Sequence, residues 1–162
     1  MQNEIVRNKT CCFTGHRLIP YNEQAAVEKR LVDVIERLVA EGYDTFVSGG
    51  AIGFDSMAAK SVLRLRKRMP HIRLVMALPC KDQHARWSLR DKKEYEYILR
   101  CADSIVCLNE AYCTGCMHMR NRFMVDNSSV CIAYLTSKTG GTAYTIKYAE
   151  ESDVGVINLA RI

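Results

Sequence analysis

The stretch VSGGAIGFDSMAA, residues 47–59, decides how this chain folds. A short apolar run ends there in glycines and an aspartate, and the residues that follow have the spacing of a helix. Glycine adopts positive φ angles at little cost and lets another group come close to the backbone. The stretch therefore predicts a strand, a tight turn and a helix in direct succession, with room for a ligand at the turn.

The same succession recurs along the chain. Apolar runs rich in β-branched and aromatic residues predict strands at 10–14, 44–48, 72–78, 104–108, 130–135 and 154–159. Helical spacing predicts a helix around Val27, Leu31, Val34, Ile35 and Leu38, and others over about 54–69, 89–101, 118–127 and 143–151. Parallel strands need crossover connections, which are usually helices. We therefore expect a single α/β domain over residues 1–162, with a doubly wound, mainly parallel sheet and helices on both faces.

The composition is that of a folded globular protein, with 48% hydrophobic residues and three prolines among 162 residues. No stretch approaches the roughly 18 unbroken apolar residues of a membrane helix, and the start MQNEIVRNKT lacks the apolar run of a secretory signal. We expect a cytoplasmic protein without a membrane partner. The net charge of +5 permits an anionic ligand without requiring nucleic acid.

Eight cysteines are then expected to be reduced thiols, with Cys11, Cys12, Cys107 and Cys131 as small core residues. Cys113, Cys116 and His118 form a C-x-x-C-x-H cluster. A structural zinc ion needs four ligands, so this cluster would need Cys80 or His84 as well. We predict no metal site, and a redox disulfide at Cys113 and Cys116 stays an open alternative.

Ligands of such sheets bind outside the carboxyl ends of the strands, and the unusual residues of this chain follow its predicted strands. Two glycine turns predict a phosphate cradle, because the first N–H groups and the dipole of a helix favour an anion. One wall would hold Gly49, Gly50 and Gly53, and the other Gly140, Gly141 and Thr142. Arg17, Arg120 and Arg122 would supply positive charge. The alternative, equally open, is that the glycines only shape tight turns.

Three further side chains are candidates for the site. Asp55 would bind a ligand hydroxyl or act as a general base, and is the candidate catalytic residue; the alternative is a helix cap. His16 would contact phosphate or donate a proton, although a structural role is favoured. Trp87 would close over a base as a lid. The basic runs 60–68 and 86–93 indicate either a nucleic-acid surface or, as we favour, solvated helix faces.

The pieces TCCFTGHR, FVSGGAIGFDSMAA, ALPC, YCTGCMHMRNRFMVD and TGGTAYTIKYA, in this order from residue 10 to residue 149, resemble the YpsA-type branch of the SLOG superfamily. That superfamily includes DprA-type DNA-processing proteins and LOG phosphoribohydrolases. The resemblance implies a Rossmann-like fold, a nucleotide-derived ligand and a homodimer. The site residues that it implies are Gly15, Arg17, Ser48, Gly49, Gly50, Gly53, Asp55, Arg120, Asn121, Arg122, Gly140, Gly141 and Thr142.

We therefore expect a binder of a nucleotide or nucleotide derivative, such as an ADP-ribose or NAD fragment, that serves as a sensor or regulatory module. One alternative is hydrolysis of an N-glycosidic bond with Asp55 as acid or base. TGGTAYTIKYAE lacks the P-G-G-x-G-T-x-x-E pattern of the phosphoribohydrolases, which favours binding over hydrolysis. The other alternative is a DprA-like binder of single-stranded DNA, which we do not favour.

Overall fold

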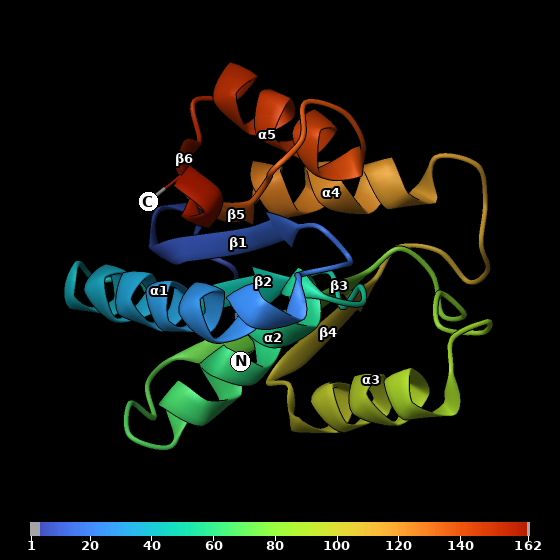
Figure 1. The fold of residues 1–162 in the computed structure, drawn as a ribbon, viewed down its shortest axis with the longest axis horizontal. Helices are drawn as coiled ribbons and strands as arrows, with labels where there is room; N and C mark the ends of the chain where they lie inside the picture. Colours follow the sequence, from blue (N-terminus) through green and yellow to red (C-terminus); the bar gives the residue numbers. More distant parts are fainter. Residues whose placement is uncertain (1–3, 162) are drawn as a thin grey trace.

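The computed structural model describes residues 4–161, which alternate between strands and helices around one sheet (Figure 1). The strands are β1 (Thr10–Gly15), β2 (Thr45–Ser48), β3 (Arg73–Leu78), β4 (Ser104–Cys107), β5 (Val130–Tyr134) and β6 (Gly155–Asn158). The helices are α1 (Tyr21–Ala40), α2 (Phe54–Arg66), α3 (Leu89–Cys101), α4 (Cys116–Asp126) and α5 (Gly141–Glu151), with short 3-10 helices at Arg7–Lys9 and Leu159–Arg161. The predicted strands and helices are confirmed, with ends that differ by a few residues.

The sheet has the strand order β4-β3-β2-β1-β5-β6, and all of its neighbouring strands are parallel. Starting from β1, the chain adds strands in one direction as far as β4 and then crosses to the other side of β1 to form β5 and β6. The order thus reverses between β1 and β5. This is the doubly wound α/β fold that the sequence predicts, and the point of reversal is where such sheets bind ligands.

Helices cover both faces of the sheet. Figure 1 shows α4 and α5 on one face and α1, α2 and α3 on the other. Alternate residues of β1 point to opposite faces: Phe13 packs in the core under α1 and α2, whereas Cys12 packs with Met124 and Val125 of α4. Both faces are buried, which explains why the central strands are continuous apolar runs. The predicted apolar stripe of α1 is buried as well.

Cys11, Cys12 and Cys131 are buried, as predicted. Cys107 is exposed, so the prediction that it is a core residue was wrong. Cys107 lies on β4, the strand at one edge of the sheet, where burial alternates along the strand. Ile105, on the same face of β4, is 48% exposed. An apolar run alone does not reveal that one face of an edge strand is uncovered.

The longest helix, α1, carries charged residues on the side opposite its apolar stripe. Within residues 4–161, no helix combines the length and the apolar character needed to cross a membrane.

Candidate ligand-binding site

A pocket of about 270 Å³ lies where the strand order reverses. It is formed by the loop after β1, the turn that leads into α2, the first turns of α4 and the N-terminus of α5. Its lining residues are Thr14, Gly15, His16, Arg17, Ala51, Asp55, Met117, Arg120, Asn121, Thr139, Gly140, Gly141 and Thr142. Residues from four separate segments of the chain therefore meet at one point.

The N-terminus of α5 forms one wall of the pocket. Gly140 precedes the helix with a φ of 102°, and no side chain caps the first N–H groups of α5. A β-carbon added to Gly140 or Gly141 would meet no atom within 4 Å, so the space above these residues is open. Free N–H groups and the helix dipole at an open surface favour an anion.

Arg120 points into the pocket from α4 and is only 5% exposed. Its Nη1 donates to the carbonyl oxygen of Gly49 at 2.6 Å, and its Nε donates to Oδ1 of Asn121 at 2.8 Å. A weaker contact of 3.8 Å joins Nη2 to the sulfur of Met117. The guanidinium group has five N–H donors, so it keeps donors for a ligand while these contacts fix its position.

Asp55 lies in the first turn of α2 and is 5% exposed. Burial raises the pKa of its carboxyl group to about 6, although Arg120, a hydrogen bond from the Ala51 N–H and Arg17 act in the opposite direction. Its Oδ2 accepts that hydrogen bond at 3.3 Å from a residue that precedes the helix. No ion pair within 4.0 Å joins Asp55 to Arg120 in the described chain. The two buried groups therefore face one pocket without direct contact.

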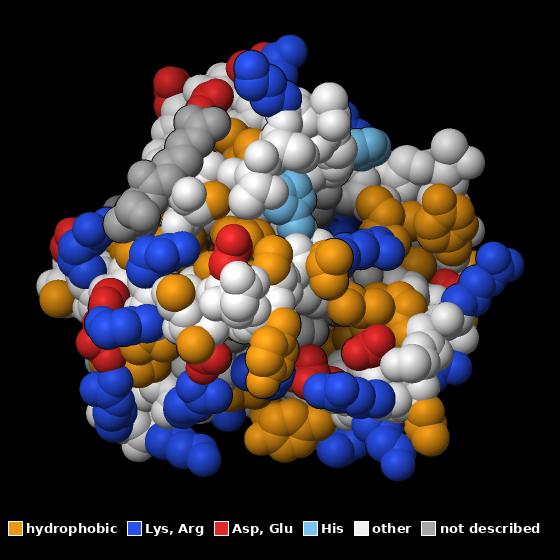
Figure 2. Space-filling view, viewed as in Figure 1, with side chains coloured by type: hydrophobic (Ala, Val, Ile, Leu, Met, Phe, Trp, Pro, Cys, Tyr) orange, Lys and Arg blue, Asp and Glu red, His pale blue; other side chains and the backbone are white. Residues whose placement is uncertain are grey.

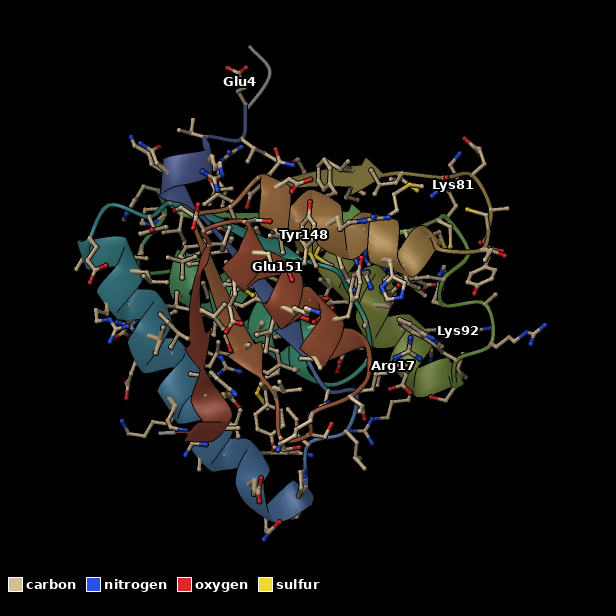
Figure 3. The ribbon with its side chains drawn as sticks, turned by 90° about the horizontal axis from the view of Figure 1, so that it is seen from above. Glu4, Arg17, Lys81, Lys92, Tyr148 and Glu151 are labelled. Carbon is tan, nitrogen blue, oxygen red and sulfur yellow. The ribbon has the colours of Figure 1, made fainter. Side chains whose placement is uncertain are left out.

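Arg17 is exposed at the rim of the pocket. Figure 3 places it beside the N-terminal end of α5, at the opposite end of that helix from Glu151. Its charge is close enough to Arg120 to lower the pKa of Arg120, after the larger effect of burial. Two guanidinium groups that repel each other beside a helix N-terminus form a site suited to an anion.

His16 lines the pocket, but its ring is also held by the protein. Its Nε2 accepts a hydrogen bond from the Thr136 N–H at 2.9 Å, which leaves Nδ1 to carry the proton of the neutral ring. The ring packs edge-on against Tyr134, with centroids 5.8 Å apart. These contacts agree with the structural role that the sequence favours, and they tie the loops after β1 and β5 together.

The glycines of the turn after β2 pack against other parts of the chain. Gly49, Gly50 and Gly53 are not among the residues that line the pocket, although Ala51 of the same turn is. A β-carbon on Gly49 would lie 2.6 Å from Nη1 of Arg120, and one on Gly53 would lie 2.2 Å from the Arg17 carbonyl oxygen. Gly50 has a φ of 73°, and its N–H donates to the buried hydroxyl of Ser48. Gly49 therefore allows the Arg120 side chain, and Gly53 the Arg17 backbone, to pack directly against this turn.

Two other predicted site residues lie away from the pocket lining. Arg122 is exposed on α4, two residues beyond Arg120, and a helix turns by about 200° over that distance. Trp87 is half-buried and packs edge-on against Tyr95, with ring centroids 5.2 Å apart. The structure thus does not bring Arg122 and Trp87 to the residues that line the pocket.

Several residues that shape the site were not predicted. Thr14, Ala51, Met117 and Thr139 line the pocket beside the predicted residues. Gln83 stabilises the glycine turn, because its Nε2 donates to the carbonyl oxygen of Gly49 at 3.1 Å and contacts the Tyr95 hydroxyl at 3.0 Å. The four unpredicted lining residues belong to the same loop motifs as the predicted ones and could have been found from them. No sequence signal indicates the role of Gln83.

A larger groove, of about 820 Å³, lies between α5 and β6. Leu135, Ile146 and Val156 contribute apolar surface, and its charged side chains, Lys138, Lys147 and Glu150, are all exposed. It contains no buried ionisable group and lies beside the edge strand of the sheet. Of the two, the smaller pocket is the better candidate, because buried charges and a helix N-terminus converge in it.

The C-x-x-C-x-H cluster lies in the turn before α4 and in the first turn of that helix. Cys113 and Cys116 are joined by a turn in which the Cys116 N–H donates to the Cys113 carbonyl oxygen at 3.1 Å. Within residues 4–161, no group of three or more His, Cys, Asp or Glu side chains could hold a metal ion. Cys113 is exposed, and slight desolvation together with neighbouring Cys116 raises the pKa of its thiol, which is the opposite of thiolate activation.

The basic run 60–68 lies on α2 and the turn after it, and its charges are largely paired. Lys60 pairs with Glu94 of α3, Arg64 with Glu28 of α1, and Arg66 with Asp103. Arg68 pairs with Glu36. On the face shown in Figure 2, Lys and Arg side chains are spread among acidic ones and form no single stripe. This run is a solvated helix face.

Comparison with known proteins gives relatives over most of the chain. A protein of Bacillus subtilis described as the uncharacterized SPbeta prophage-derived protein YoqJ is 31% identical, over 80% of this chain and 83% of its own length. A UPF0398 protein of Halalkalibacterium halodurans is 28% identical, over 85% of this chain and 71% of its own length.

Solved structures share the fold. DNA processing protein A of Helicobacter pylori, which binds single-stranded DNA, superimposes with a TM-score of 0.65 at 19% identity, covering 93% of this chain and 64% of that protein. Its counterpart from Streptococcus pneumoniae gives a TM-score of 0.66 at 18% identity, with 92% and 49% covered. The chain therefore spans about half to two thirds of these proteins. A family model described as the YspA SLOG family matches residues 13–155, and this chain belongs to that YpsA family.

Proposed function

We propose that this protein binds a nucleotide or nucleotide derivative, such as ADP-ribose or an NAD fragment, in the pocket between β1 and β5, and acts as a sensor or regulatory module. A phosphate group would lie on the N-terminus of α5, at Gly140, Gly141 and Thr142. Arg17 and Arg120 would neutralise its charge, and Asp55 and Asn121 would bind the ribose. Membership in the SLOG family supports a nucleotide-related or DNA-binding role.

The observation that carries this proposal is the buried Arg120, which lacks an ion-pair partner within 4.0 Å among the described residues and faces an open helix N-terminus. A buried charge is costly unless another group compensates it. An anion between Arg120, Arg17 and α5 would supply that compensation. The location at the reversal of strand order is also where α/β sheets bind ligands.

Thermal unfolding with AMP, ADP, ATP, ADP-ribose and NAD tests the proposal. A ligand at about a hundred times its dissociation constant should add about 2.7 kcal/mol, or roughly 5–10 °C at this size. Gly141→Asp should abolish the shift, because it adds a negative charge at the phosphate position, where a β-carbon meets no atom within 4 Å. Gly155→Asp is the matched control, since Gly155 is also exposed and lies outside the pocket. A shift that survives Gly141→Asp unchanged would reject this site.

A second candidate function is hydrolysis of an N-glycosidic bond. It is favoured by Asp55, whose pKa of about 6 suits a general acid or base near neutral pH. Incubation with AMP and ADP-ribose, followed by chromatography, should then release free base from the wild type and not from Asp55→Asn. Binding without release of base would reject hydrolysis and leave the binding proposal intact.

A third candidate is binding of single-stranded DNA, which the fold shared with DNA processing protein A favours. The paired charges of the α2 run count against a continuous phosphate-binding surface. A mobility shift with oligonucleotides at low salt is the test, because phosphate contacts are strongest there. Absence of any shift at low salt would dispose of this candidate.

A further inference from the structure

His118 and Tyr144 form an aromatic pair that the proposed phosphate and ribose contacts do not use. His118 comes from α4 and Tyr144 from α5, and their ring centroids are 4.1 Å apart with the planes tilted by 56°. Both side chains are exposed, Tyr144 by 38%. Aromatic rings that are packed against each other and still open to solvent offer a flat surface to a further ring.

The residues of this pair are close neighbours, along α4 and α5, of residues that line the pocket. His118 directly follows Met117 and precedes Asn121 by three residues, and both of these neighbours line the pocket. The Tyr144 N–H donates to the carbonyl oxygen of Gly140, and Tyr144 lies three residues beyond Gly141 on the same side of α5. The rings thus join the two helices whose N-terminal turns hold the proposed phosphate site.

The volume of the pocket indicates that part of a bound nucleotide would lie outside it. A volume of about 270 Å³ is slightly below the range of about 300–1,000 Å³ found for pockets that enclose a drug-sized ligand. A nucleotide with its phosphate on the N-terminus of α5 would therefore extend beyond the pocket. The space above Gly140 and Gly141 is open, so the part outside would emerge beside the aromatic pair.

We propose that His118 and Tyr144 form a stacking surface for the base of the ligand, so that the site selects base-bearing nucleotides over sugar phosphates. This inference rests on the proposed function and adds to it the position and the selectivity for the base. Stacking on an aromatic side chain requires no particular hydrogen-bond pattern, since every base has a π face. The site would then discriminate by the presence of a base more than by its identity.

The test compares AMP with ribose 5-phosphate by isothermal titration calorimetry. The wild type should bind AMP more tightly than ribose 5-phosphate. Tyr144→Ser should weaken AMP binding by about fivefold or more and leave ribose 5-phosphate unchanged, because stacking on one aromatic residue contributes about that much or more. Tyr144→Phe, which keeps the ring, should bind both as the wild type does.

Two results would overturn the stacking surface while the proposed function stands. One is an unchanged affinity of Tyr144→Ser for AMP, and the other is an equal loss of affinity for both ligands, which would indicate a general disturbance of the site. If the wild type binds neither compound while another nucleotide of the panel still shifts its thermal unfolding, the stacking surface alone is overturned. If no nucleotide of the panel shifts the unfolding either, the proposed site fails, and the stacking surface fails with it.

Discussion

Arg120 and Asp55 are buried charged residues that face one pocket without forming an ion pair. The sequence RNR indicated that arginine belongs to the site, but it could not tell Arg120 from Arg122, because the choice depends on how α4 is rotated against the sheet. The carboxylate of Asp55 was predicted from its place after the glycine turn. Its burial, which sets its pKa, depends on neighbours from other parts of the chain and could not be predicted.

Arg17 provides the first prediction at this scale. Replacing the exposed Arg17 by glutamine should weaken binding of a phosphate-bearing ligand by about 10- to 100-fold, because a hydrogen bond to a charged group contributes about 1.5–3 kcal/mol. The midpoint of thermal unfolding without ligand should hardly change. Arg122→Gln is the control, since Arg122 is also exposed but does not line the pocket, and calorimetry measures the affinity of both variants. Equal losses in the two variants would contradict the proposed role of Arg17.

Asp55 predicts a dependence of stability on pH. Its pKa of about 6 exceeds the value near 3.8 of an exposed aspartate, so the folded chain holds the proton more tightly than the unfolded chain. The resulting stabilisation is fully present below pH 3.8 and is lost as the pH rises through 6. At pH 7.5, Asp55→Asn should therefore be more stable than the wild type by up to about 3 kcal/mol, since each pKa unit corresponds to about 1.4 kcal/mol.

Urea unfolding of both proteins between pH 4 and pH 8 measures this effect. The advantage of Asp55→Asn should shrink as the pH falls from 6 towards 4. A difference that stays constant over this range would show that the pKa of Asp55 is not raised in the folded protein.

At the scale of elements, the turn after β2 brings α2 and α4 close to the loop after β1. The sequence predicts the strand, the turn and the helix over 47–59, and all of them are present. It does not reveal which neighbours require the glycines. Gly49 is close to Arg120, from far along the chain, and Gly53 is close to the backbone of Arg17. These contacts form only when the sheet assembles.

Gly53→Ala should therefore destabilise the fold far more than Gly42→Ala. Both glycines have a positive φ, of 88° and 103°, and either substitution costs roughly 1–2 kcal/mol for that reason. A β-carbon at Gly53 would in addition clash with the Arg17 carbonyl group, whereas at Gly42 it meets nothing within 4 Å. We expect Gly53→Ala to lose roughly 2 kcal/mol more than Gly42→Ala in urea unfolding. Similar losses of stability in the two variants would show that the turn after β2 accommodates the added β-carbon without further loss of stability.

At the scale of the whole molecule, the reversal of strand order between β1 and β5 determines where the candidate site lies. The alternation of strands and helices predicts a doubly wound sheet, but not the order of its strands. Strand order depends on which helices cover which face, and similar apolar runs give no basis for choosing between orders. Only the assembled sheet shows that the loops after β1 and β5 are neighbours.

The distribution of charge leads to a prediction at the same scale. Replacing both Arg64 and Arg68 by glutamine removes ion pairs with Glu28 and Glu36 of α1. Each such surface pair contributes about 0–1 kcal/mol, so the loss of stability should be small. Affinity for the nucleotide, measured by calorimetry, should not change, because these side chains lie outside the pocket. A large fall in affinity would mean that the ligand uses this face of the protein.

The most direct measurement is a crystal structure with the nucleotide that gives the largest thermal shift. We predict that its phosphate lies between Arg17, Arg120 and the N-terminus of α5, within hydrogen-bonding distance of the N–H groups of Gly141 or Thr142. Density for the nucleotide in the groove between α5 and β6, or on the charged face of α2, would contradict the proposed site.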